Sequence, residues 1–294
     1  ALFPLLPLSK SGMKPIVAMP NPFYQAYAAA ALGINAEPLY VPAGQKHGFL
    51  PDYENLPEAA LERLGAVYIC SPSNPEGAAA GEDYWHALFR LAERYDFIVL
   101  ADECYADIYY DRPPASALPT RLKQSGGFTR LLTFHSLSKR SGLPGLRSGM
   151  VAGDPQLIAR FLAFRHVAGP QMPGPIMAAS AAAWRDEAHV TANRALYAEK
   201  MALAERILGN AAAFTKPAGG LFLWLHTGNG EETTLALWRE QGVKVLPGAY
   251  MGREIELGKI QSNPGFPYIR IALVKDLSTI MTALERVRDF LEAQ

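Results

Sequence analysis

Three features are scarce or absent in this sequence, and each absence excludes a class of protein. Among 294 residues there are only two cysteines, Cys70 and Cys104, which is too few for a disulfide framework and fits a reduced, cytoplasmic setting. No uninterrupted apolar stretch reaches the roughly 18 residues that a membrane-spanning helix needs. The 28 Lys and Arg residues balance the 28 Asp and Glu residues, so no excess positive charge attracts nucleic acid or an anionic membrane. We therefore expect small-molecule partners.

What is present indicates a folded protein with a substantial core. Hydrophobic residues make up 49% of the chain and charged residues only 19%, which excludes general disorder. At about 150 residues per domain, the length predicts two domains. The six histidines show no metal-ligand spacing, so we expect no metal site.

Short apolar runs alternate with helical patterns through the first two thirds of the chain. This order predicts an α/β fold, a mostly parallel sheet with helices on both faces. The expected strands are 15–19, 38–41, 66–70, 97–101, 130–134 and 150–152, and the expected helices are 22–32, 81–95 and 155–166.

The last third has a looser order that predicts a smaller α+β domain. Residues 175–208 are mostly helical, with a bend expected near 185–186. The later strands are expected at 221–225, 243–246 and 268–274, and the later helices at 233–241 and 277–293. We place a large domain at 1–190 and a small C-terminal domain at 191–294.

Polar clusters follow three of the expected strands, at Asn74, Asp102 and Lys139. In parallel sheets, ligands bind outside the carboxyl ends of the strands, so these side chains are expected to converge there. Read singly, each has an ordinary alternative. Asn74 precedes a proline and could serve a turn, Asp102 could cap a helix, and Tyr105 could pack in the core.

The sequence around Lys139 indicates a reactive amine. Lys139 lies between serines and just after a buried strand, where an amine held out of water can act as a nucleophile. Arg147, in a Gly- and Pro-rich turn, could fold back to form an anion site with Ser136 and Ser138, although a surface loop with ordinary basic residues is the alternative. Pyridoxal 5′-phosphate (PLP) needs such a lysine, a phosphate site, a carboxylate for its ring nitrogen and donors for its phenolic oxygen.

The motifs that carry these residues resemble the class I/II aminotransferases of fold type I, which use PLP. They run through nearly the whole chain in the family's order: S-P-S-N-P-E-G at 71–77, D-E-C-Y at 102–105, S-L-S-K at 136–139, G-L-R-S-G at 145–149, P-A-G-G-L-F at 217–222, V-L-P-G at 245–248 and Y-I-R-I-A-L-V at 268–274.

The resemblance implies roles for the cofactor-binding residues. Lys139 would bond to the cofactor aldehyde and then move a proton between the substrate α carbon and the cofactor C4′. Asp102 would pair with the pyridine nitrogen, and Asn74 and Tyr105 would bind the phenolic oxygen. The phosphate would be held by three residues: Ser136, Ser138 and Arg147.

Two further roles follow from the resemblance. Arg270, with Asn74 beside it, would bind the substrate α-carboxylate, for which a bidentate guanidinium is well suited. Tyr24 would stack on the cofactor ring. Two neighbours, Phe23 and Tyr27, could stack instead, and Tyr24 could belong to the core.

Within the family, the runs at 21–27, 134–141, 144–154 and 179–190 are most similar to the N-succinyldiaminopimelate aminotransferases. That resemblance implies exchange of an amino group between N-succinyl-LL-2,6-diaminopimelate and 2-oxoglutarate in lysine biosynthesis, by a cytoplasmic homodimer. The alternatives are an aminotransferase for other amino acids, another fold type I PLP enzyme, or a non-catalytic PLP-binding regulatory domain.

The chain departs from the family pattern in three places. Glu76 stands where threonine is commoner, and Ser148 stands where an aliphatic residue is usual. Family members also carry an N-terminal arm and a phosphate loop at a helix N-terminus, before the position of Ala1. We expect Ala1–Phe3 to continue that helix, with part of the active site lying upstream.

Overall fold

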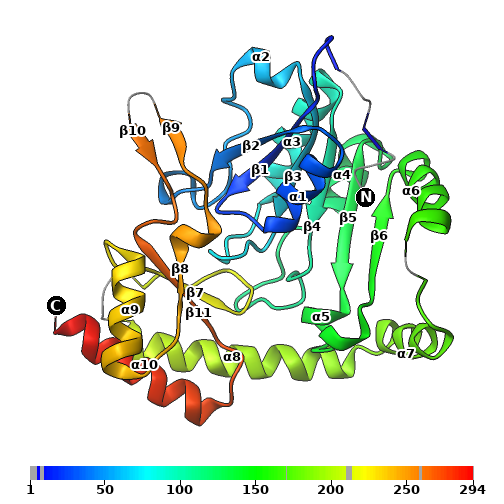
Figure 1. Ribbon diagram of the computed structural model, residues 1–294. Coiled ribbons are helices and arrows are strands. Elements are labelled where there is room, and N and C mark those ends of the chain that lie inside the picture. The colour runs from blue at the N-terminus through cyan, green and yellow to red at the C-terminus, as the bar shows by residue number, and fades with distance from the viewer. Residues whose placement is uncertain (1–4, 7–9, 170, 210–213, 258–259, 294) are drawn as a thin grey trace.

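The computed structural model describes residues 5–6, 10–169, 171–209, 214–257 and 260–293 (Figure 1). The helix expected at Ala1–Phe3 lies outside the described residues. No helix in the described part of the chain is long and apolar enough to cross a membrane.

A six-stranded sheet forms the larger body of the molecule. Its strands are β1 (Ile16–Asn21), β2 (Glu37–Pro42), β3 (Leu64–Cys70), β4 (Ile98–Asp102), β5 (Leu131–Ser136) and β6 (Gly149–Gly153). They lie in the order β2-β1-β3-β4-β5-β6, and every neighbouring pair is parallel except β5 with β6. The expected mostly parallel sheet is confirmed, and its edge strand β6 is antiparallel.

Helices cover both faces of this sheet (Figure 1). They are α1 (Gln25–Gly33), α2 (Glu58–Leu61), α3 (Glu82–Tyr95), α4 (Ala117–Ser125) and α6 (Pro155–Ala168), with short turns α5 (Leu137–Arg140), η1 (Gln45–His47) and η2 (Pro144–Leu146). Successive residues of a strand face opposite ways. In β4, Val99 packs with Trp85 and Phe89 of α3, whereas Leu100 packs with Tyr27 of α1. Two cores therefore enclose one sheet, which explains its continuous apolar strands.

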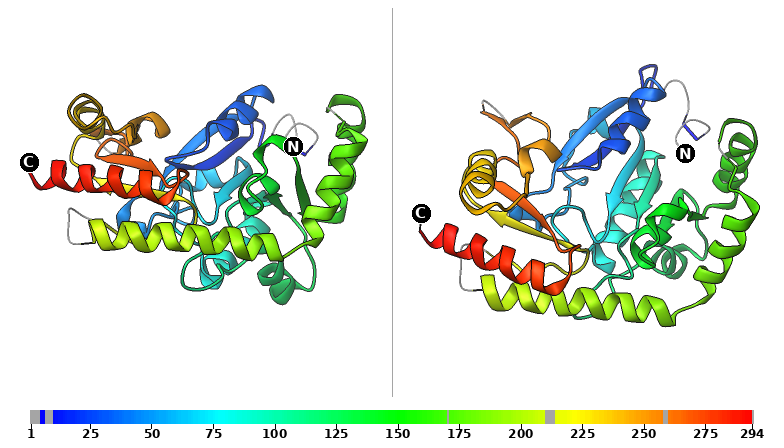
Figure 2. Two further views of the ribbon diagram at one scale, coloured as in Figure 1. Left: turned by 90° about the horizontal axis from the view of Figure 1, so that it is seen from below. Right: turned by 60° about the horizontal axis from the view of Figure 1, so that its bottom comes forward.

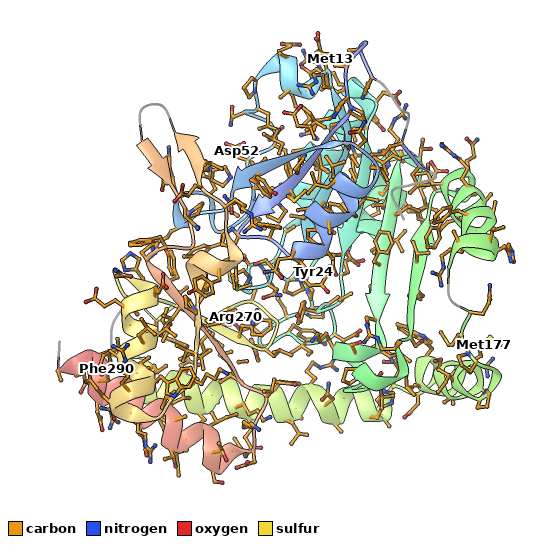
Figure 3. All side chains as sticks on the ribbon, viewed as in Figure 1. Met13, Tyr24, Asp52, Met177, Arg270 and Phe290 are labelled. Atoms are coloured by element: carbon orange, nitrogen blue, oxygen red, sulfur yellow. The ribbon has the colours of Figure 1, made fainter. Side chains whose placement is uncertain are left out.

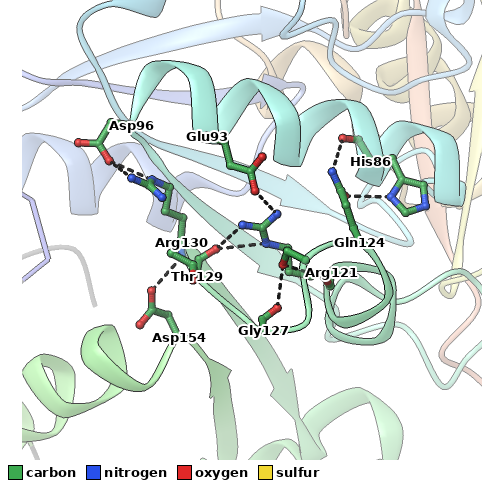
Figure 4. Close-up of polar contacts among 10 residues, drawn as sticks. His86, Glu93, Asp96, Arg121, Gln124, Gly127, Thr129, Arg130 and Asp154 are labelled. Atoms are coloured by element: carbon green, nitrogen blue, oxygen red, sulfur yellow. Dashed lines mark hydrogen bonds and ion pairs between the residues drawn. The ribbon is translucent and has the colours of Figure 1, made fainter.

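Polar contacts fix α3 and α4 to the start of β5 (Figure 4). Arg121 of α4 is only 2% exposed, and its Nη1 lies 2.7 Å from Oε1 of Glu93 in α3. Its Nε and Nη2 donate to the carbonyl of Thr129, at 3.3 and 3.1 Å. Arg130, the residue after Thr129, pairs with Asp96, which directly follows α3. This side of the sheet is thus held by ion pairs as well as by apolar packing.

Two helices lead to the second, smaller sheet. α7 (Gly174–Arg185) and α8 (Ala188–Leu208) are separated at the expected bend, and α8 runs along the molecule to the small sheet (Figure 2). That sheet is antiparallel, in the order β7-β11-β8. The elements here are β7 (Phe222–His226), α9 (Gly230–Gln241), β8 (Leu246–Pro247), η3 (Gly248–Met251), β9 (Ile255–Leu257), β10 (Ile260–Ser262), β11 (Tyr268–Ala272) and α10 (Leu277–Glu292).

The small sheet has its own core. Leu225 and Ile269 pack with Leu237 of α9 and Leu284 of α10. Because α8 crosses residue 190 without a break, the division of the chain into 1–190 and 191–294 stays a prediction.

Two local expectations need correction. The strand expected at 243–246 is confined to β8, because Val243 caps α9 through its N–H to the carbonyl of Leu237 and is buried without joining the sheet. The β9–β10 hairpin was not expected, because its strands have only three residues each, too few for a clear strand pattern.

Candidate active site

A pocket of about 410 Å³ lies where the carboxyl edge of the large sheet meets the small sheet. All nine residues singled out from the sequence line it: Tyr24, Asn74, Asp102, Tyr105, Ser136, Ser138, Lys139, Arg147 and Arg270. Five others complete the lining: Tyr27, Cys70, Cys104, Pro144 and Phe222. The convergence follows from topology, since parallel strands end at one edge.

Asp102 is the last residue of β4 and accepts two hydrogen bonds. Its Oδ1 accepts from the backbone N–H of Cys104 at 3.1 Å, so the side chain does cap the turn that follows. Its Oδ2 accepts from the hydroxyl of Tyr27 at 2.5 Å. The carboxylate is therefore held in one orientation at the pocket wall.

Tyr27 is the partner that sequence reasoning missed in this role. It is 6% exposed, and its ring stacks on Tyr68 with centroids 4.1 Å apart and planes 7° from parallel. Burial, and then the charge of Asp102, raise the pKa of Tyr27, so its hydroxyl stays protonated and remains a donor. The sequence holds one indication of this role: Tyr27 lies in the helix that follows Tyr24, on the side of that helix that is buried.

Lys139 lies in α5, directly after β5. The hydroxyl of Ser136 caps α5 by accepting from the N–H of Ser138 at 3.1 Å. From α8, Nδ2 of Asn193 donates to the carbonyls of Lys139 and Arg140, at 3.0 and 3.1 Å. The lysine backbone is thus held from two sides while its Nζ lies 5.7 Å from the ring centroid of Tyr105.

Tyr105 is buried, as the packing alternative supposed, and it also lines the pocket. Its ring meets that of Phe222 at 65°, with centroids 5.9 Å apart. Burial raises the pKa of its phenol, which therefore stays a neutral donor at neutral pH.

Arg147 directly follows η2 and has a positive φ of 52°, which is uncommon for a residue other than glycine. Its Nη1 donates to the carbonyl of Pro144 at 2.7 Å, and the side chain is exposed. The turn brings this cation to the same pocket as Ser136 and Ser138, as expected.

Arg270 comes from the middle strand of the small sheet. Its Nη1 donates to Oδ1 of Asn74 at 2.9 Å, and its guanidinium carbon lies 4.3 Å from the ring centroid of Phe222. Its Nε is buried and has no hydrogen-bond partner among the described residues. Burial lowers the pKa of this arginine. A half-buried guanidinium with an unused donor is suited to an anionic ligand such as a carboxylate.

The aromatic residues near the mouth of the pocket can now be distinguished. Tyr24 is 55% exposed, so it does not belong to the core, and its ring meets that of Tyr27 edge-on at 5.7 Å. Figure 3 shows Tyr24 and Arg270 near one another where the two sheets meet. Phe23 is 2% exposed and packs against Tyr40, which removes it from the pocket.

The two cysteines of the pocket were not expected there. Burial, and then the charge of Asp102, raise the pKa of both Cys70 and Cys104, so both thiols stay protonated at neutral pH. Among the residues that the structure describes, no group of three or more His, Cys, Asp or Glu could hold a metal ion.

Comparison with known proteins agrees with this geometry. The family model described as "Aminotransferase class I and II" matches residues 8–286. A probable aminotransferase of Mycobacterium tuberculosis is 34% identical over 234 residues, which cover 78% of this chain and 53% of the relative. An LL-diaminopimelate aminotransferase of Dehalococcoides mccartyi is 27% identical over 282 residues, which cover 94% of this chain and 69% of the relative. The chain thus spans about half the length of the first relative.

A solved structure is similar to this chain both in fold and in sequence. The aminotransferase from Neisseria meningitidis Z2491 superposes with a TM-score of 0.90 at 38% sequence identity. The match covers 98% of this chain and 72% of that one.

Proposed function

The chain belongs to the class I and II aminotransferases, and from this premise we propose that it transfers amino groups between amino acids and 2-oxo acids with PLP as its cofactor. The observation that carries the proposal is the convergence of an amine, a carboxylate, a phenol and two guanidinium groups in one pocket. When bound, PLP supplies an electron sink for the negative charge that develops at the substrate α carbon.

The pocket fits this cofactor in the chemistry of its donors and acceptors. The carboxylate of Asp102, oriented by Tyr27, would accept from the protonated ring nitrogen. The neutral phenol of Tyr105 and the amide of Asn74 would donate to the phenolic oxygen. The exposed ring of Tyr24 would cover one face of the cofactor.

The phosphate would be bound at the turn around α5. The hydroxyls of Ser136 and Ser138 and the guanidinium of Arg147 all line that side of the pocket. A guanidinium with two hydroxyls gives a charge-assisted site for a phosphate group.

Two side chains would act on the substrate. Arg270 would bind the α-carboxylate through its free Nε–H, while its hydrogen bond to Asn74 fixes the plane of the guanidinium. The amine of Lys139 would remove the proton from the α carbon as a general base. Burial of Arg270 strengthens its attraction for a carboxylate, because the surroundings screen the charges less than water does.

As the substrate pair, we propose N-succinyl-LL-2,6-diaminopimelate and 2-oxoglutarate, in lysine biosynthesis. The supporting observations are the motif resemblance and the relative from Dehalococcoides mccartyi, whose name specifies LL-diaminopimelate. Turnover of aspartate or aromatic donors without turnover of the succinylated substrate would overturn this choice and leave the aminotransferase proposal standing.

We also propose that the enzyme is a cytoplasmic homodimer. Three large apolar side chains of α6 and α7 support the dimer, because each is at least half exposed: Leu162 at 51%, Val167 at 90% and Met177 at 54%. An interface would remove them from water. Sedimentation of the full-length protein at micromolar concentration should give twice the monomer mass, and a monomer would contradict the proposal.

The decisive experiment is a glutamate-coupled transamination assay on the full-length gene product with Lys139→Ala. We expect the wild type to bind PLP with a visible absorption band and to turn over substrate, and the variant to lose both. A variant that keeps full activity would overturn the proposed function. Lys275→Ala, on the surface after β11, is the matched control and should keep both.

A further inference from the structure

A second cavity, of about 380 Å³, lies behind the Asn74–Arg270 hydrogen bond. It is formed by the 45–49 turn and 76–78 of the large body, and by 214–218, β7 and β11 of the smaller one. Its volume is within the range of about 300–1,000 Å³ that small-molecule sites occupy. No residue of the proposed active site lines it.

The two cavities are neighbours on one sheet face. In the antiparallel pair β7–β11, Arg270 lies opposite Trp224 and Tyr268 lies opposite His226. Alternate residues of a strand share a face, so Tyr268 and Arg270 point the same way. Asn74 and Glu76 are also two residues apart, on the segment that faces this sheet. Asn74 and Arg270 therefore line the first cavity, and Glu76 and Tyr268, two residues away on the same segments, line the second.

Glu76 is the unusual group of this second cavity. Its side chain lines the cavity, the residue is only 8% exposed, and its Oε1 has no hydrogen-bond partner among the described residues. Burial raises its pKa to about 8, and hydrogen bonding from its own backbone and from Ser73 offsets only part of that effect. A buried carboxyl oxygen without a partner costs about 1–3 kcal/mol, so this position calls for an explanation.

The surrounding groups favour a positively charged partner. Trp224 and Tyr268 lie stacked, with centroids 4.8 Å apart and planes 9° from parallel, and Phe49 meets Tyr268 edge-on at 6.2 Å. Aromatic rings attract cations through their π faces. From β7, the titratable residue that lines the cavity is His226, whose ring centroid lies 5.1 Å from that of Tyr268.

The lysine of this cavity does not neutralise Glu76. Nζ of Lys216 lies 3.0 Å from Asp111 and 3.6 Å from Glu205, so its charge is already matched by two carboxylates. The hydrogen bond to Asp111 raises the pKa of Lys216, which keeps it charged. The unmatched group inside the cavity is thus the carboxyl of Glu76.

We propose that this cavity binds a small organic cation, an ammonium or guanidinium group that pairs with Glu76 and lies against the rings of Trp224 and Tyr268. Such a ligand supplies the missing donor to Oε1 and turns the neutral acid into a carboxylate. Binding would therefore release the proton of Glu76 and become tighter as that group ionises.

The test is calorimetric titration of the PLP-loaded, full-length protein with methylguanidinium, which stays charged and is not a substrate amine. At constant ionic strength, we expect saturable binding whose affinity rises about tenfold from pH 7 to pH 9, because a carboxyl with a pKa of about 8 goes from about 9% to about 91% ionised. Tyr268 stays neutral over this range, since burial raises its pKa. N-methylurea, the uncharged analogue, should bind at least tenfold more weakly.

The variant Glu76→Gln keeps the size of the side chain and removes its charge. It should bind methylguanidinium at least tenfold more weakly at pH 9 and lose the pH dependence, whereas Glu62→Gln on the surface should behave as the wild type. Equal binding by wild type and Glu76→Gln, equal binding of N-methylurea, or no saturable binding would each overturn the proposal. The pH series on the wild type decides the matter even if the variant folds poorly. Because amino-group transfer is measured separately, failure here leaves the proposed function untouched.

Discussion

The hydroxyl of Tyr27 donates a hydrogen bond to Oδ2 of Asp102 at 2.5 Å, joining α1 to the end of β4. The other oxygen of Asp102 is occupied by the N–H of Cys104, so each carboxylate oxygen has a fixed donor. The buried ring of Tyr27 stacks on the ring of Tyr68. A rigid stack therefore sets the direction in which Asp102 presents its charge to the pocket.

Tyr27→Phe should weaken cofactor binding with little loss of fold stability. The ring stays stacked, but Asp102 loses a charge-assisted hydrogen bond, whose contribution of about 1.5–3 kcal/mol corresponds to about tenfold or more in affinity. The measurement is an absorbance titration of the protein with PLP. Tyr53→Phe is the control, because it also removes a buried phenol hydrogen bond, to the carbonyl of Tyr68, but lies outside the pocket. Equal affinity in Tyr27→Phe and wild type would contradict this role.

Arg270→Lys should raise the KM for glutamate at least tenfold. Lysine cannot present two parallel N–H groups to a carboxylate, and it leaves Oδ1 of Asn74 without its present donor. Steady-state kinetics should show a larger change in KM than in kcat, because the role proposed for the guanidinium is to bind substrate rather than to move a proton. Arg288→Lys on the exposed side of α10 should change neither constant. An unchanged KM in Arg270→Lys would exclude the proposed carboxylate site.

Arg121→Met should destabilise the fold by about 1–3 kcal/mol, because the carbonyl of Thr129 loses both of its donors. The free energy of unfolding in urea is the measurement. Lys123→Met, two residues along the same helix, removes an exposed ion pair with Glu82 and should cost less than about 0.5 kcal/mol. If both variants lose the same free energy of unfolding, the contacts of Arg121 in Figure 4 do not stabilise the fold as predicted.

Glu76 should make the protein less stable as the pH rises. Its pKa is about 8 in the folded state and near 4.5 in the unfolded chain, so the folded state binds the proton more tightly. The stabilisation is complete below pH 4.5 and is lost as the pH rises through 8, a change on the order of 5 kcal/mol at 1.36 kcal/mol per pKa unit. The difference between wild type and Glu76→Gln in urea unfolding at a series of pH values isolates this contribution. A difference that stays constant from pH 5 to pH 9 would contradict the burial of an ionisable Glu76.

The sequence allowed the sheet and the convergence of polar residues to be predicted, because both follow from order along the chain. Strand direction is harder to predict. The sequence predicts a further strand at 150–152 without its direction. The twelve residues between Ser136 and Gly149 form only the short helices α5 and η2, and without a crossover helix β6 pairs antiparallel with β5.

The contacts across the chain could not be predicted in the same way. Tyr27 and Asp102 are 75 residues apart, and nothing local marks them as partners. Glu76 was recognised as a departure from the family motif, but its burial depends on how 214–218 and β11 close over it. Both features depend on contacts between segments that are far apart in the sequence, which a local pattern does not encode.

The helix α8 has a consequence for anyone who recombines this protein with its relatives. At one end, Asn193 holds the carbonyls of Lys139 and Arg140; further along, Met201 and Leu208 are part of the small core. A chimera joined at residue 190 would therefore take Lys139 from one parent and Asn193, which holds the backbone of that lysine, from the other. Exchange of halves should preserve function only if the 136–140 turn travels together with α8.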